Sequence, residues 1–76
     1  MIPVVAVAEG ISEIASLYLQ ISSQPTDAEL VSEMAGAVFR FIAVTESRGW
    51  LGWLNLDAIA AACNEAYSLH LASQLS

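Results

Sequence analysis

The residues best suited to chemistry are four glutamates that form two pairs, each pair spaced four residues apart. Glu9 and Glu13 form the first pair, and Glu29 and Glu33 form the second. Carboxylates on two neighbouring helices can hold metal ions in a helical bundle, but that chemistry also uses Glu-x-x-His pairs, which the chain lacks. The spacing therefore predicts two solvated acidic faces, and we expect no metal and no other cofactor.

Cys63, Tyr67 and His70 follow one another at spacings of four and three, which places them on one face of a helix. A cysteine and a histidine can act as nucleophile and base when they come within hydrogen-bond reach. Seven residues of helix separate the Cα atoms of Cys63 and His70 by about 10 Å, which is too far. We therefore predict no catalytic residue, and enzymes are the least favoured functional class.

Arg40 and the two tryptophans are the remaining side chains of functional interest. Arg40 has no acidic residue three or four positions away, so it is a surface arginine, an interhelical ion-pair partner or an anchor for an anion. Trp50 and Trp53 lie in a turn with Gly49 and Gly52. They either close the end of a helical bundle, form an interface hot spot or line an apolar ligand site.

Helices must position these side chains, because apolar residues recur at spacings of three and four along most of the chain. The spacing predicts helices over residues 3–22, 26–48 and 55–75. The expected buried face of the first helix consists of Val4, Val7, Ile11, Ile14, Tyr18 and Ile21. Residues 2–8 are rich in β-branched side chains, so a short strand is the competing prediction there.

Local signals mark the ends of these helices. Thr26 followed by Glu29 is typical of a capping box, and Gly49 suits the left-handed residue after a helix. Asn55 or Asp57 is expected to cap the third helix. Its expected buried face consists of Ile59, Ala60, Cys63, Ala66, Tyr67, His70 and Leu71. The predicted fold class is all-α, with one domain over residues 1–76 and three helices joined by short connections.

Composition limits the partners of the chain. The 76 residues are 57% apolar and carry a net charge of −6, with eight acids against two arginines. This charge argues against binding nucleic acid, and we expect no membrane insertion because no apolar run reaches the roughly 20 residues of a membrane span. The lack of a signal-peptide pattern and the single cysteine favour the cytoplasm. An apolar excess in so small a chain favours burial against a second copy, as a homodimer or higher oligomer.

Two functional hypotheses follow from these observations. The first is a small acidic protein-interaction module, an adaptor or inhibitor, that acts as a homo-oligomer and offers acidic faces to a partner with a basic surface. Its expected interface residues are Val38, Phe41, Ile42, Trp50 and Trp53. The alternative is a helical protein that binds a small apolar molecule. Its expected pocket residues are Met34, Phe39, Arg40, Trp50, Trp53, Tyr67 and His70.

Overall fold

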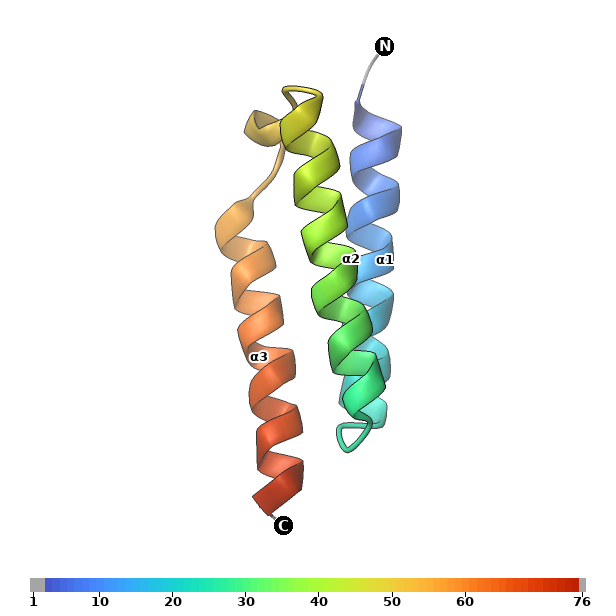
Figure 1. Ribbon diagram of the computed structural model, residues 1–76, viewed down its shortest axis with the longest axis vertical. Helices are drawn as coiled ribbons and strands as arrows, with labels where there is room; N and C mark the ends of the chain where they lie inside the picture. The colour runs from blue at the N-terminus through green and yellow to red at the C-terminus, as the bar shows by residue number, and fades with distance from the viewer. Residues whose placement is uncertain (1–2, 76) are drawn as a thin grey trace.

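Three helices of equal length make up the protein, as a computed structural model of residues 3–75 shows (Figure 1). Helix α1 spans Val4–Ser23, α2 spans Ala28–Ser47 and α3 spans Leu56–Leu75, with a short 3-10 helix, η1, at Leu51–Trp53. Each long helix runs antiparallel to the one before it. The all-α prediction is confirmed, and the strand alternative is wrong for residues 4–8; residue 2 lies outside the described residues.

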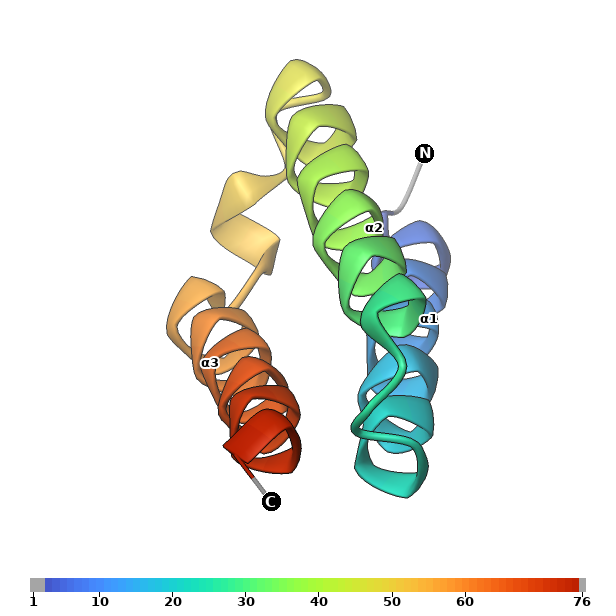
Figure 2. The same ribbon diagram turned by 60° about the horizontal axis from the view of Figure 1, so that its bottom comes forward.

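The molecule is long and thin, with principal extents of 47 × 17 × 15 Å. Helices α1 and α2 pack most closely, while α3 lies further to one side, as the view from the lower end shows (Figure 2). The accessible surface is 5057 Å². A compact monomer of this mass is expected to expose about 4500 Å², so this arrangement leaves more surface open than usual.

Helix α2 begins one residue later than the capping box predicts. The Asp27 side chain is the cap, because its Oδ1 accepts a hydrogen bond from the backbone N–H of Glu29 at 3.0 Å. The prediction that Thr26 caps this helix is therefore wrong. A carboxylate is well suited to this position because the first turn exposes N–H groups and carries the positive end of the helix dipole.

The connection between α2 and α3 follows the sequence signals more closely. Gly49 has a φ of +73° directly after α2, as expected for a glycine that ends a helix. Asn55 rather than Asp57 caps α3, since its Oδ1 accepts a hydrogen bond from the N–H of Ala58 at 3.0 Å. Between them the chain forms η1, which the sequence analysis did not predict.

The hydrophobic core lies mainly between α1 and α2. Its buried side chains are Ile14, Leu17, Ile21, Met34, Ala37 and Ala66. Val4 and Ile11, which were expected on the buried face of α1, are exposed, whereas Leu17 is buried. The expected face was therefore wrong in part, because the side of α1 that contacts its neighbours is rotated towards Leu17.

Helix α3 contributes far less to the core than the other two helices do. Only Ile59 and Ala66 are buried among its described residues. Tyr67 and Leu71, which were expected on its buried face, are exposed, and so is Ala60. The prediction failed because many residues of α3 are alanine, so apolar positions surround the helix and do not define one face.

Polar contacts add to the attachment of α3. His70 Nδ1 lies 2.7 Å from the carbonyl oxygen of Pro25, and Ser73 Oγ donates to the same oxygen at 3.0 Å. Since a carbonyl only accepts hydrogen bonds, the His70 proton must be on Nδ1. Closer to the middle of α3, the Glu65 carboxylate raises the pKa of the Tyr18 phenol on α1, because a nearby negative charge favours the protonated hydroxyl.

Helix α1 also has the length and composition of a membrane-spanning helix. It has 20 residues, and its mean hydropathy reaches 1.4 over an 18-residue window that is 22% buried. The expectation that no segment is long and apolar enough is therefore wrong, because it treated Glu9 and Glu13 as breaks in the apolar run. This similarity to a membrane span is one of length and composition alone. In the structure, Ile14, Leu17 and Ile21 of the same helix pack in the protein core.

Candidate functional site

An open apolar groove with a volume of about 640 Å³ lies between α2 and α3. On α2 it is lined by Val31, Met34, Ala35, Val38, Phe39, Ile42, Ala43 and Glu46. On α3 it is lined by Cys63, Asn64, Ala66 and Tyr67, and Ile21 of α1 also contributes. Small side chains such as Ala35, Ala43 and Ala66 create the hollow, because a larger residue at any of them would partly fill it.

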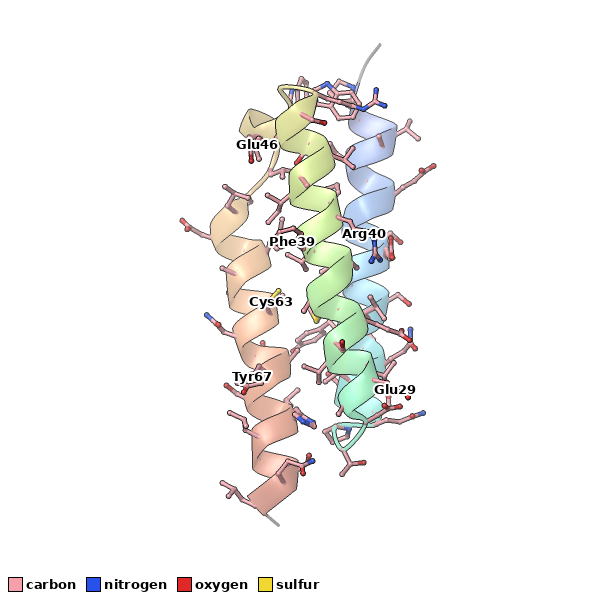
Figure 3. The ribbon with its side chains drawn as sticks, viewed as in Figure 1. Glu29, Phe39, Arg40, Glu46, Cys63 and Tyr67 are labelled. Atoms are coloured by element: carbon pink, nitrogen blue, oxygen red, sulfur yellow. The ribbon has the colours of Figure 1, made fainter. Side chains whose placement is uncertain are left out.

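Two aromatic side chains stand at the margins of the apolar groove. Phe39 of α2 is 78% exposed and Tyr67 of α3 is 54% exposed. Figure 3 shows Phe39 on the side of α2 next to α3, with Tyr67 on the neighbouring helix. A phenylalanine this exposed is unusual for a folded monomer, and together with the groove it forms a continuous apolar patch of the kind that marks binding surfaces.

Cys63 is the single cysteine of the chain and lies half-buried in the apolar groove. Burial raises the pKa of its thiol above the usual value, because the thiolate is poorly solvated there. A raised pKa reduces the fraction of reactive thiolate at neutral pH, which argues against Cys63 as a nucleophile.

A second, polar cleft of about 420 Å³ lies between α1 and α2 and contains Arg40. The Arg40 guanidinium Nη2 lies 3.9 Å from Glu13 Oε1, and the two side chains are 71% and 61% exposed. A pair this exposed contributes little to stability. The guanidinium lies over Gly36, where a Cβ atom would be 3.2 Å from Nη1. Arg40 is therefore an interhelical partner of Glu13 and does not face the apolar groove.

The predicted interface residues are divided between three places. Val38 and Ile42 line the apolar groove. Phe41 instead packs within the molecule, where its ring contacts Gly10 of α1. Trp50 and Trp53 lie in the connection at the end of the bundle, and neither lines the apolar groove.

The two tryptophans differ from each other in their surroundings. Trp50 is half-buried, its backbone N–H donates to the backbone carbonyl of Thr45 at 2.7 Å, and the Arg48 guanidinium carbon lies 5.4 Å from its ring centroid. Trp53 is 59% exposed. Trp50 therefore belongs to the structure that ends α2, while Trp53 faces solvent beyond the groove.

The predicted pocket residues are likewise not brought together. Met34, Phe39 and Tyr67 line the apolar groove. Arg40 lies in the polar cleft, and His70 is bound to the carbonyl of Pro25 at the far end of the bundle. Among residues 3–75, Glu46 is the one charged side chain that lines the groove, so a ligand there would meet no cation from this part of the chain.

The alanines and Val31 that line the groove on α2 were not among the site residues predicted from the sequence. Ala35, Phe39 and Ala43 recur every four residues, which was a visible signal that they share one face. The exposure of these three side chains depends on the distance between α2 and α3. Residue spacing within one helix does not predict that distance.

Among residues 3–75, no group of three or more His, Cys, Asp or Glu side chains is placed to hold a metal ion. Known protein families, curated proteins and solved structures provide no match to the chain. Its function is therefore inferred from the residues and their geometry.

Proposed function

We propose that the protein is a small interaction module that pairs with a second copy of itself through the apolar groove. The observation that carries this proposal is the combination of an open apolar hollow with Phe39, a large apolar side chain exposed beside it. A two-fold dimer needs one surface that complements itself, and this surface offers both a projection and a hollow.

Charge also favours a second copy as the occupant of the groove. Of the eight acids in the chain, Glu46 alone lines the groove. Two copies can therefore meet there without bringing most of their negative charge together. Glu9, Glu13, Glu29 and Glu33 would stay outside the pair, where they favour a further partner with a basic surface.

A dimer interface would have to extend beyond the apolar groove onto the exposed side chains of α2 and α3. A stable interface buries about 800 Å² on each partner, which is about one-sixth of the 5057 Å² that the chain exposes. Tyr67 lines the groove on α3, and Leu56 and Leu71 are further exposed apolar side chains of the same helix.

Light scattering after size exclusion, over a dilution series, tests the pairing. We expect a species of twice the 8.1 kDa chain mass that dissociates on dilution. Phe39→Glu should produce a helical monomer, because it places a charge in the buried contact. Leu19→Glu is the matched control, since Leu19 is an exposed residue of α1 outside the groove. A wild-type monomer at all concentrations would exclude the proposed dimer.

The volume of the groove supports one second candidate, the binding of a small apolar molecule. Ligand sites commonly enclose about 300–1,000 Å³, and the groove lies within this range. Alkylation of Cys63 provides a readout, because an apolar dye bound in the groove would slow it. Protection by the dye in a protein that remains monomeric would favour this candidate over the dimer.

A further inference from the structure

The outer face of α2 alternates small and large side chains. Ala35, Phe39 and Ala43 are four residues apart, so they lie one above the other on the helix, and all three are exposed. An exposed phenylalanine with an alanine on either side is a projection between two hollows. Two antiparallel copies of such a face fit together when the phenylalanine of each lies against an alanine of the other.

Two registers satisfy this fit, and they differ in where Glu46 lies. In the first, Phe39 is level with Ala35 of the second copy. Because the helices are antiparallel, Glu46, seven residues further along, is then level with Ala28 of the second copy. Asp27 and Glu29 flank that position, so the first register brings acidic side chains together.

In the second register, Phe39 is level with Ala43 of the second copy. Glu46 is then level with Gly36 of the second copy, over which the Arg40 guanidinium lies with Nη1 3.2 Å from the position of a Cβ atom. Arg40 is exposed, and its contact with Glu13 is a long one at 3.9 Å. It can therefore turn towards a carboxylate that approaches from the outer face of α2.

We infer that two copies pair through antiparallel α2 helices in the second register, with Phe39 against Ala43 and Glu46 beside Arg40. Size allows both registers and charge selects the second, in which the two-fold axis forms each contact twice. This inference depends on the proposed dimer, and it specifies which residues determine the choice of partner.

Charge reversal tests the register. Glu46→Arg and Arg40→Glu should each raise the dissociation constant of the dimer at least about tenfold, since each sets like charges against each other. The double variant E46R/R40E should restore the affinity to within about threefold of wild type. Glu9→Arg is the control, because it changes the net charge as much as E46R does but lies on α1.

Exchanging the large side chain at position 39 with the small one at position 43 tests the register a second time, through the affinity of the dimer. Ala43→Phe and Phe39→Ala should each weaken the dimer, and the double variant F39A/A43F should recover affinity only in the second register. Circular dichroism confirms that each variant is folded.

The outcomes separate the register from the dimer itself. A dimer that Phe39→Glu disrupts, but whose affinity E46R and R40E leave unchanged, would overturn the register and keep the proposed function. Rescue by F39A/A35F in place of F39A/A43F would assign the first register. A wild-type protein that is always monomeric would overturn both.

Discussion

Gly10 and Phe41 show how a single residue sets the spacing of α1 and α2. A Cβ atom at Gly10 would overlap the ring of Phe41, whose Cζ would be 2.9 Å away. Glycine in the interior of a helix costs about 1 kcal/mol relative to alanine. The close contact with the ring explains why glycine occupies this position in spite of that cost.

Gly10→Ala is therefore expected to lower the free energy of unfolding by about 1–2 kcal/mol, because the overlap outweighs the gain in helix propensity. In a Phe41→Ala background, the same change should instead stabilise the protein by about 0.5–1 kcal/mol. Urea denaturation followed by circular dichroism measures both values. Gly52→Ala is the control, because nothing lies within 4 Å of a Cβ atom there. A stabilising Gly10→Ala in the wild type would contradict the close contact.

Thr45 is a second residue whose role depends on its surroundings. It is 2% exposed, and its hydroxyl lies 2.9 Å from both the Phe41 and the Ile42 carbonyl oxygens. This bonding within α2 satisfies the hydroxyl, so a polar residue can occupy the core. Thr45 was not among the core residues predicted from the sequence.

At the scale of the elements, caps define where the helices begin, and α2 offers a direct comparison of two candidates. Asp27→Ala should cost about 1 kcal/mol of unfolding free energy, since it leaves the N–H of Glu29 without its acceptor. Thr26→Ala should cost less than about 0.5 kcal/mol, because Thr26 is exposed and precedes the cap. Thermal and urea denaturation provide the comparison. A larger loss from Thr26→Ala would restore the capping box as the start of α2.

The existence and approximate bounds of the helices were predictable from sequence, because apolar spacing and end signals act over a few residues. Gly49 and Asn55 lie between α2 and α3, as expected from the sequence. The rotation of α3 was not predictable, since its alanines give no contrast between faces. The apolar groove was not predictable either, because it depends on the position of α3 relative to α2. That position involves contacts such as His70 with Pro25, which are 45 residues apart.

At the scale of the whole molecule, the apolar excess is distributed over the surface as well as the core. Large apolar side chains on all three long helices are exposed, including Val5, Leu19, Phe39, Leu56 and Leu71. Composition alone predicted an excess of apolar residues. The apolar groove is one place where such residues are exposed together. The dilution series tests whether a second copy covers that surface.

The unequal burial of the three helices has a consequence for how the molecule opens. Helices α1 and α2 hold most of the core, while α3 is attached through Ile59, Ala66 and the hydrogen bonds to Pro25. Regions with few buried contacts unfold locally at a smaller free-energy cost than the core does. We therefore expect α3 to open as a unit while the α1–α2 hairpin stays folded.

Native-state hydrogen exchange measures this directly. Amides of α3 should exchange at least about tenfold faster than those in the middle of α1 and α2. His70→Ala should speed exchange in α3 about fivefold further, through the loss of about 1 kcal/mol, and leave the hairpin unchanged. Uniform protection across the three helices would contradict this. If α3 opens in this way, the width of the apolar groove fluctuates, because α3 forms one of its walls. The α2 surface that carries Phe39 stays in place, because α2 remains packed against α1.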